Sequence, residues 1–521
     1  MRNWGLYIYY ALIMAIFAYA VYYHTTLICY NYQIELREVA IIETTDMVNQ
    51  HENPFVFQNL PEKLNVYGIV YNYTAAPIIS LFKTDSLITH RVLTALYILL
   101  SVVFLAFVQY KLGIKLFVII GSSVLFYATY LTNVNIQPRP DSLGLLLFLI
   151  AVLYPLVRSY SYGSLAGSII LTILAFYTKI YFVLAAPVIV SYLFLFVSKK
   201  KAVYYALCFG ILFGLSAIIV NHYCPAYFYV TVILSKLAGV YNIPTLLKQF
   251  RDYFLLEHPG YTILSLVVLY KFISSTAFKF QFKDTWQKIS LLNIGKPLIP
   301  ETNISIIAWA GICGFLVFAL KLGGHHGSYL IYLLQLFVPF YIIAVNKQLT
   351  RLNISEKFVQ VVILSSVITS LLMLGGLYTK QDTATFVKVE KEILSNKEVL
   401  SFPAFNSILY KNNYRIYDDG QVEYYKFLYT GIGPQSFYSK YFNKIWVAKK
   451  YCDAYTTLIQ HKVQHKDFGL IYYHQRMKWM HIDSALAQNY YLADSVTVAF
   501  RHSYLTYDIQ IWKPQNQSIK Q

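Results

Sequence analysis

A chain of 521 residues with 57% hydrophobic and 13% charged residues is far more apolar than a soluble domain, in which about 25% of residues are charged. The mean hydropathy of +0.47 agrees with this difference. A formal net charge of +18 would suit a nucleic-acid partner, but cationic loops on the cytoplasmic face of a membrane explain it more simply. The composition therefore predicts an integral membrane protein whose partner is the lipid bilayer and not nucleic acid.

Apolar stretches long enough for a transmembrane helix, which needs about 20 residues, recur over residues 1–378. The first stretch follows a single Arg2 and precedes no cleavage site, which favours a retained span over a signal peptide. We predict a polytopic α-helical membrane protein with about 11 transmembrane helices. The expected spans are 7–23, 91–109, 114–131, 142–157, 164–178, 181–198, 203–220, 260–276, 304–321, 328–345 and 357–378.

The charges of the loops indicate an orientation. With a cytoplasmic N-terminus, the inside loops contain Lys111, Arg158 and the lysine run 199–201, as the positive-inside rule expects. The first outer loop, 24–90, contains more acids than bases. The chain after the last span then also lies outside.

The composition changes sharply after residue 378. The region 379–521 mixes polar, apolar and aromatic residues, with short alternating runs such as "KIWVAKKY" (444–451) and "FGLIYYH" (468–474). Such alternation is typical of strands, and the region is long enough for a core. We predict a C-terminal soluble α/β domain outside the membrane. Its "DDG" run, 418–420, is expected to form a turn and not a metal site.

Ionisable residues of the predicted spans gather on the outer side. They are Arg139 and Asp141 before span four, Lys179 between spans five and six, and His325 with His326 after span nine. The first outer loop adds Glu35, Glu38, Glu43 and Asp46. Ionisable groups at membrane depth are costly and tend to mark substrate pathways. Their common side predicts an outward-facing polar site covered by the first loop and the C-terminal domain.

Each of these groups also has a structural explanation. Asp141 can cap the helix that it begins, and Lys179 can extend toward the lipid headgroups. Glu38 can lie on the solvated face of an amphipathic interfacial helix. The histidine pair between glycines can belong to a loop. The functional interpretation depends on their shared side of the membrane.

The order of features along the chain is distinctive: a retained first span, a long outer loop with early acids that runs to "NPF" and "YGIVYNY" (67–73), "RPDSLG" (139–144) heading span four, and a soluble C-terminal domain. This order resembles the GT-C superfamily of integral membrane glycosyltransferases, in particular its protein mannosyltransferase and aminoarabinose transferase type. In architecture the resemblance covers the whole chain. In motifs it covers only the first loop, 139–144, 179–182 and 324–329.

The resemblance implies transfer of a sugar from a polyprenyl-phosphate donor to a hydroxyl acceptor, with an early first-loop acid and a second acid at the catalytic centre and basic residues on the phosphate. Position by position, it points to Glu38 with Glu35 in reserve, and to Asp141, Arg139, Lys179 and His326. Asp46 is a further candidate acid, and His325 joins His326 as a phosphate ligand. Many members have an Asp or an Asp-Glu pair where this chain has "LREV" (36–39), so the first-loop acids stay alternatives.

The chemistry of glycosyl transfer requires the same residue types. A base removes the proton of the acceptor, a contribution of about 10²–10⁴ in rate, and cations neutralise the departing phosphate. We predict that Glu38 is this base in a single inverting displacement and that it faces Asp141 across one cavity. A divalent metal is possible, and no other cofactor is expected.

Two other functions use similar groups. A multi-pass transporter or flippase for lipid-linked glycans would also carry charges at membrane depth, and an envelope glycan polymerase or ligase would use the same acids and bases. The type of family favours the bacterial inner membrane, with the active site on the extracytoplasmic face.

Overall fold

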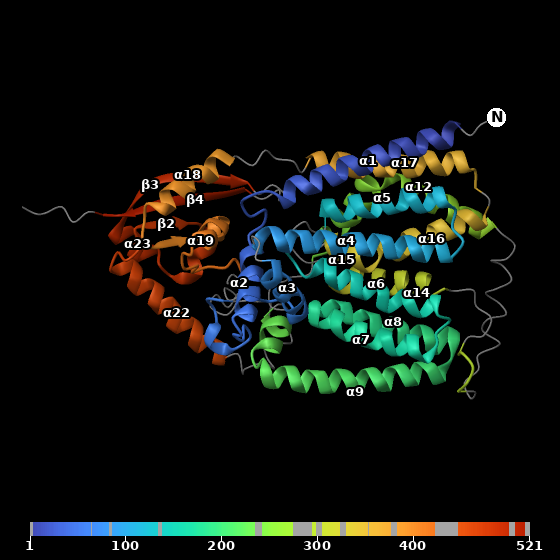
Figure 1. Ribbon diagram of the computed structural model, residues 1–521, viewed down its shortest axis with the longest axis horizontal. Coiled ribbons are helices and arrows are strands. Elements are labelled where there is room, and N and C mark those ends of the chain that lie inside the picture. The colour runs from blue at the N-terminus through green and yellow to red at the C-terminus, as the bar shows by residue number, and fades with distance from the viewer. Residues whose placement is uncertain are drawn as a thin grey trace, which may run out of the picture.

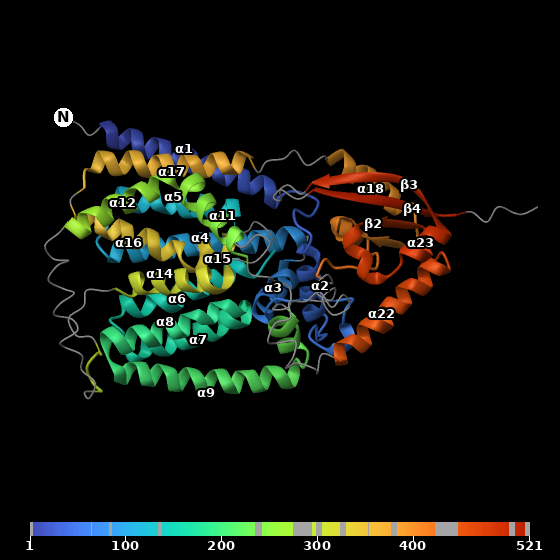
Figure 2. The same ribbon diagram turned by 180° about the vertical axis from the view of Figure 1, so that it is seen from behind.

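The computed structural model of the chain describes residues 4–63, 65–82, 86–133, 138–234, 242–274, 294–298, 305–323, 330–352, 354–376, 383–421, 446–499 and 506–515. Within these residues the protein is mostly helical, with one small sheet near the C-terminus. Long helices lie side by side in a bundle, and the sheet with its own helices sits at one end of it (Figures 1 and 2). The N-terminus lies at the opposite end.

Each of the eleven segments predicted as spans contains helix. Within the described residues, four are long and apolar enough to cross a membrane: Trp4–Ile28, Ser86–Lys111, Ile180–Val197 and Lys199–Tyr223. This is as expected of a membrane protein, whereas the number of spans stays a prediction. The helices of the bundle are α1 (Trp4–Ile28), α4 (Ser86–Lys111), α5 (Leu116–Asn133), α6 (Asp141–Val157), α7 (Tyr162–Thr178), η2 (Ile180–Leu184), α8 (Ala185–Tyr192), η3 (Leu193–Val197), α9 (Lys199–Tyr223), α11 (Ile243–Arg251), η5 (Asp252–Glu257), α12 (Pro259–Ser274), α14 (Ile306–Val317), η7 (Phe318–Leu322), α15 (Leu330–Leu336), α16 (Val338–Arg351) and α17 (Glu356–Gly376).

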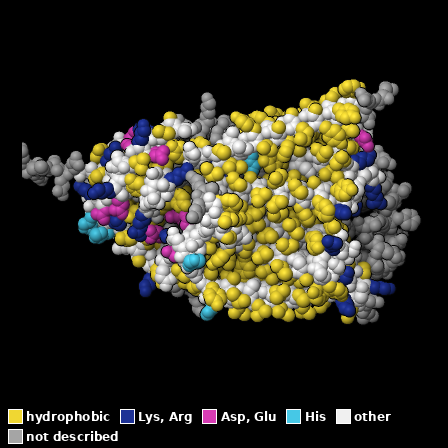
Figure 3. Space-filling model, viewed as in Figure 1, with side chains coloured by type: hydrophobic (Ala, Val, Ile, Leu, Met, Phe, Trp, Pro, Cys, Tyr) yellow, Lys and Arg dark blue, Asp and Glu magenta, His cyan; other side chains and the backbone are white. Residues whose placement is uncertain are grey.

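The flank of the bundle is apolar. Hydrophobic side chains cover the face seen in Figure 3, whereas charged side chains gather toward its two ends, with lysine and arginine at the end far from the sheet. In α9, Leu215 is 53% exposed and Ile218 is 69% exposed. Leucine and isoleucine exposed along whole helices are stable in lipid and not in water.

A break between α15 and α16, within the segment predicted as the tenth span, lies beside one residue of the candidate site. The helical line from residue 330 to 351 is interrupted at Phe337, between α15 and α16. Pro339 is the second residue of α16, and proline has no N–H to donate to the preceding helical turn. A Cβ on Gly314 of α14 would lie 2.0 Å from the Leu336 carbonyl oxygen. Only glycine therefore allows α14 to approach the break so closely, beside buried Gln335.

The segment between α1 and α4, the predicted first outer loop, is folded. It contains α2 (Glu38–Asn49), the short helix η1 (Phe57–Asn59) and α3 (Ile69–Phe82). The apolar side chains of Val39, Ile41 and Ile42 in α2 are buried. Glu38 has no exposed surface, so the expectation of a solvated carboxylate on an interfacial helix is wrong. The reason is that α2 packs against α3 and α4 and under the C-terminal region.

The C-terminal region combines helices with a mixed sheet of strand order β1-β2-β4-β3. β1 runs parallel to β2, with Val399 opposite Leu470, and the other pairs are antiparallel. The elements are α18 (Thr383–Leu394), β1 (Val399–Ser401), η8 (Pro403–Phe405), α19 (Asn406–Lys411), α22 (Trp446–Gln464), β2 (Leu470–Tyr473), η11 (Gln475–Met480), α23 (Asp483–Asn489), β3 (Tyr490–Ala499) and β4 (Thr506–Pro514).

The two alternating runs have different outcomes. "FGLIYYH" contains β2, but "KIWVAKKY" runs into α22 from Trp446 onward. The strand interpretation of that run is wrong because the apolar spacing beyond it is helical: Cys452, Tyr455, Ile459 and Val463 are all buried. The "DDG" run forms the predicted turn, in which the Gly420 N–H donates to Asp418 Oδ1 at 3.0 Å.

One hydrophobic core joins the first loop to the C-terminal region. Leu36 and Val39 of the loop belong to the same buried cluster as Phe405 and Tyr472. A Cβ on Gly420, which has a φ of +85°, would lie 2.4 Å from the Leu36 carbonyl oxygen. The described residues of the first loop and of the C-terminal region therefore share one buried cluster.

Candidate functional site

The candidate site begins at the head of α6, where Asp141 is buried. Its Oδ1 accepts hydrogen bonds from Lys179 Nζ at 2.5 Å, Tyr181 Oη at 2.9 Å and Gln335 Nε2 at 3.4 Å. Its Oδ2 has no hydrogen-bond partner among the described residues. The carboxylate thus accepts from three side chains of two other segments, 179–181 and α15, and it makes no capping hydrogen bond to α6.

Lys179 is held where the first loop meets the end of α7. The Gly68 N–H donates to the Thr178 carbonyl at 3.1 Å, and a Cβ on Gly68 would lie 1.8 Å from the Tyr177 carbonyl oxygen. This approach brings the ring centre of Tyr67 within 5.0 Å of Lys179 Nζ. The Lys179 side chain is 13% exposed, so it does not extend to the lipid headgroups.

Two further tyrosine rings complete the surroundings of the ammonium group. The ring centre of Tyr181 lies 5.3 Å from Lys179 Nζ, and that of Tyr332 lies 6.0 Å away. A cation over an aromatic face is stabilised by the ring quadrupole, and more so where water is excluded. Gly144 is the reason that this part of the chain can pack so closely, since a Cβ there would lie 2.3 Å from the Phe182 ring.

Arg139 pairs with an acid of the first loop, and that acid is Glu35. Arg139 Nη2 lies 2.7 Å from Glu35 Oε1, and the two side chains are 10% and 18% exposed. The other oxygen of Glu35 accepts the Arg37 N–H at 2.8 Å. The Arg139 guanidinium also lies 6.0 Å from the Tyr67 ring centre, so one tyrosine contacts both cations of the site.

Glu38 lies in a different set of contacts. Its carboxylate accepts Arg91 Nη2 at 2.9 Å and the Ile34 N–H at 2.8 Å, and both ion-pair side chains are 0% exposed. Burial raises the pKa of Glu38, and Arg91 opposes part of that rise. The expectation that Glu38 faces Asp141 is corrected: the two carboxylates bind different cations, and Glu35 is the first-loop acid on the Arg139 side.

The other two candidate acids of the first loop, Asp46 and Glu43, have other surroundings. Asp46 Oδ2 accepts the Tyr410 hydroxyl at 2.7 Å, and burial raises the pKa of Asp46. Burial also raises the pKa of Glu43, to about 8, with Lys63 opposing the rise. Asp46 thus supports the contact between α2 and the C-terminal region, whereas the charges that act on Glu43 belong to the first loop itself. His325 and His326 lie outside the described residues.

The site therefore brings together Glu35, Arg139, Asp141 and Lys179 from segments that are far apart in the sequence. Sequence reasoning missed Tyr67, Tyr181, Gln335 and Arg91. A signal existed for Gln335, because it is a polar residue within an apolar stretch. Among the described residues, no three histidine, cysteine, aspartate or glutamate side chains come together as a metal site.

Comparisons of the chain with protein-family models, with curated proteins and with solved structures give no match. A function can therefore be proposed only from the chemistry of the site.

Proposed function

We propose that the protein is a membrane glycosyltransferase that moves a sugar from a polyprenyl-phosphate donor to a hydroxyl acceptor at the outer face of the membrane. The observation that supports this most is the double ion pair Arg139–Glu35 and Lys179–Asp141 at the end of the bundle under the first loop. Two cations suit a phosphate, and two acids suit proton removal and orientation of hydroxyl groups.

Binding of the donor requires that its phosphate replace a carboxylate as the partner of one of the two cations. Without ligand, each cation neutralises one carboxylate, so an anionic phosphate must compete with a carboxylate for it. The Arg139–Glu35 pair is the more open one, because Asp141 in the other pair has no exposed side chain. The phosphate takes Arg139, whose planar fork pairs with two oxygens, and Glu35 is released.

The released Glu35 then acts as the general base. It accepts the proton of the acceptor hydroxyl while the acceptor oxygen bonds to the anomeric carbon of the sugar. The bond from that carbon to the phosphate oxygen breaks, its electron pair stays with the polyprenyl phosphate, and the configuration inverts. Arg139 and Lys179 neutralise the departing anion. Asp141, oriented by three donors, offers its second oxygen to a substrate hydroxyl.

Glu35 replaces Glu38 as the preferred base for a geometric reason. A base must come within about 3 Å of the proton that it removes. The Glu38 carboxylate is sealed from solvent by Arg91 and the turn before α2. The prenyl tail of the donor would lie along the apolar flank of the bundle, which explains why such an enzyme is embedded in a membrane, here the bacterial inner membrane.

A transporter or flippase for lipid-linked glycans is the second candidate. The break at Phe337 favours it, because interrupted helices line the binding sites of many transporters, and Gln335 beside this break contacts Asp141. A flippase would move the donor across the bilayer without cleaving the sugar–phosphate bond.

The test uses the purified protein in lipid nanodiscs with a synthetic polyprenyl-phosphate sugar and a panel of glycan, lipid and peptide acceptors. The measurement is release of polyprenyl phosphate. We expect release by the wild type and its loss in Glu35→Gln, with donor binding retained. Arg158→Gln, at the far end of α6, is the control and should stay active. A wild type that binds the donor, never cleaves it and moves it across liposome membranes would establish the transporter instead.

A further inference from the structure

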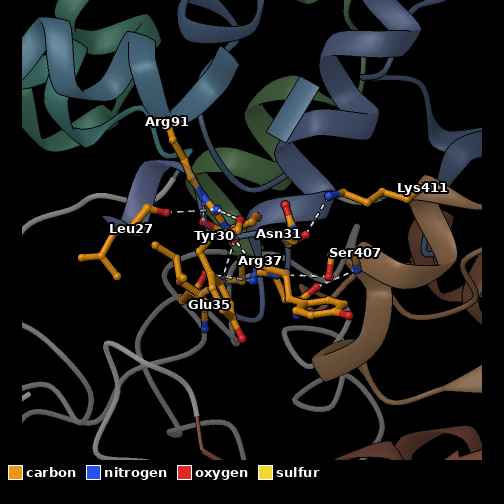
Figure 4. Close-up of polar contacts among 12 residues, drawn as sticks. Leu27, Tyr30, Asn31, Glu35, Arg37, Arg91, Ser407 and Lys411 are labelled. Carbon is orange, nitrogen blue, oxygen red and sulfur yellow. Dashed lines mark hydrogen bonds and ion pairs between the residues drawn. The ribbon is translucent and has the colours of Figure 1, made fainter. Parts of the chain in front are cut away.

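The turn that carries Glu35, residues 29–37, has no regular secondary structure and is held first by the bundle. Arg91 of α4 donates to the carbonyls of Leu27 at 3.2 Å, Tyr30 at 2.5 Å and Tyr32 at 2.7 Å (Figure 4). The same guanidinium binds Glu38. One buried side chain thus fixes both the entry of the turn and its exit.

The C-terminal region holds the other side of the turn through α19. The Gln33 N–H donates to Ser407 Oγ at 3.1 Å, and the Ser407 N–H donates to Gln33 Oε1 at 2.9 Å. Gln33 Nε2 also donates to the Pro403 carbonyl at 2.5 Å. Both Gln33 and Ser407 are buried. Near the surface, Lys411 Nζ donates to the Asn31 carbonyl at 2.7 Å (Figure 4).

These contacts converge just before Glu35. Gln33 is tied to the C-terminal region, and the next residue, Ile34, donates its N–H to Glu38, which Arg91 holds. We infer that Gln33 is a positioning residue for Glu35, through which the C-terminal domain sets the place of the catalytic base. This inference rests on the proposed function.

The physical reason lies in the entropy of an irregular turn. Fixing the backbone of a residue in one conformation costs conformational entropy, and a segment without regular hydrogen bonds of its own must offset that cost through contacts with other elements. A misplacement of about 1 Å in a reacting group can reduce the rate by about 10². The side chain of Gln33 makes two of the three hydrogen bonds that join this residue to Pro403 and Ser407. The turn is also joined to the C-terminal region at Asn31 and Tyr32, so removal of the Gln33 side chain loosens the turn next to Glu35 and does not detach it.

The experiment compares Gln33→Ala with two other variants in nanodiscs. Gln33→Glu keeps an acceptor for the Ser407 N–H but loses the donor to Pro403, and Lys411→Met removes the exposed contact on the same helix as the matched control. We expect Gln33→Ala to reduce kcat by about 10- to 100-fold with KM for the donor changed less than kcat, Gln33→Glu to fall between, and Lys411→Met to stay near wild type. Hydrogen exchange of the amides in 31–37 should rise in the same order.

Several outcomes would overturn the inference. If the wild type transfers sugar and Gln33→Ala keeps full kcat, the inference about Gln33 is wrong while the proposed function stands. This holds whether or not hydrogen exchange in the turn rises. The inference also fails if kcat falls while exchange in 31–37 stays unchanged. Absence of donor cleavage by the wild type would instead defeat the proposed function first, and the inference with it. Should Gln33→Ala not fold, Ser407→Ala removes one bond of the reciprocal pair and must show the same direction of change.

Discussion

Arg91 and Glu38 form an ion pair of 2.9 Å in which neither side chain has any exposed surface. The pair links α4 to the start of α2 and lies behind the turn that carries Glu35. Two acids three residues apart therefore have different roles: Glu38 is part of the frame, and Glu35 faces the cations of the site.

The first prediction concerns Glu38→Gln. The change leaves the Arg91 charge buried without a counter-ion, and removal of one partner of a buried pair costs about 3–5 kcal/mol. We expect a clear fall in the midpoint of thermal unfolding in detergent. Turnover per folded molecule should fall less than in Glu35→Gln, because glutamine at position 38 keeps one acceptor oxygen for the Ile34 N–H that holds the turn. Glu35→Gln should show the reverse, with little change in stability and turnover lower by about 10² or more. Loss of turnover in folded Glu38→Gln, with Glu35→Gln active, would restore Glu38 as the base.

The second prediction concerns the kind of cation at position 139. Arg139→Lys keeps the charge but loses the planar fork that pairs with two phosphate oxygens. We expect it to lose donor affinity nearly as far as Arg139→Ala, by at least about tenfold, which is about 1.4 kcal/mol. Binding of a fluorescent polyprenyl phosphate to the nanodisc-embedded protein measures this. Wild-type affinity in Arg139→Lys would remove Arg139 from the phosphate site.

The third prediction concerns the buried pair of Lys179 and Asp141. Lys179→Met and Asp141→Asn each leave an uncompensated polar group beside the three tyrosine rings, so each should destabilise the protein strongly. The double variant removes both charges, and its loss of stability should be smaller than the sum by about 0.5–3 kcal/mol. Unfolding in detergent supplies the four stabilities of the cycle. Simple additivity would contradict a direct interaction.

The fourth prediction concerns pH. Burial raises the pKa of Glu43 in the folded protein to about 8 from an ordinary value of 4.5. Between these values the unfolded chain has lost this proton while the native state retains it, so stability falls as pH rises from about 4.5 to 8. We expect the unfolding temperature of the wild type to fall relative to Glu43→Gln by about a degree or more over that range. Parallel curves for the two proteins would show that Glu43 ionises normally.

The fifth prediction concerns orientation. Lys388 of α18 is exposed beside the sheet, and Lys200 of α9 is exposed at the other end of the bundle. In a background without the five native cysteines, which include exposed Cys29, a membrane-impermeant maleimide should label Lys388→Cys in intact cells and Lys200→Cys only after permeabilisation. The opposite pattern would invert the topology and place the site inside.

The sequence alone predicted the helices of the bundle because long apolar stretches have few other stable structures in lipid. It also predicted that Arg139, Asp141 and Lys179 lie together, since each falls at the outer end of its helix. It did not predict which first-loop acid joins them. That choice depends on the turn before α2, whose conformation is fixed by contacts with Arg91 and Ser407 and not by local pattern.

The helical break beside Gln335 and the tyrosine rings around Lys179 could not be predicted from local sequence patterns either, because both depend on contacts between distant segments. The helical break beside Gln335 depends on the packing of Gly314 against Leu336, two positions that no periodicity connects. The rings around Lys179 come from three segments, and only the close approach at Gly68 brings Tyr67 among them.

The shared core also imposes an order on biosynthesis. Gln33 and Ser407 are separated by 374 residues, so the first loop is synthesised long before its partner has been translated. Until then the apolar side chains of Leu36 and Val39 lack the cover of Phe405 and Tyr472. Contacts of such long sequence separation form late and leave aggregation-prone surfaces open meanwhile. A chain that stops after α17 would therefore lack the residues that cover Leu36 and Val39, and we expect it to behave as an aggregation-prone folding intermediate.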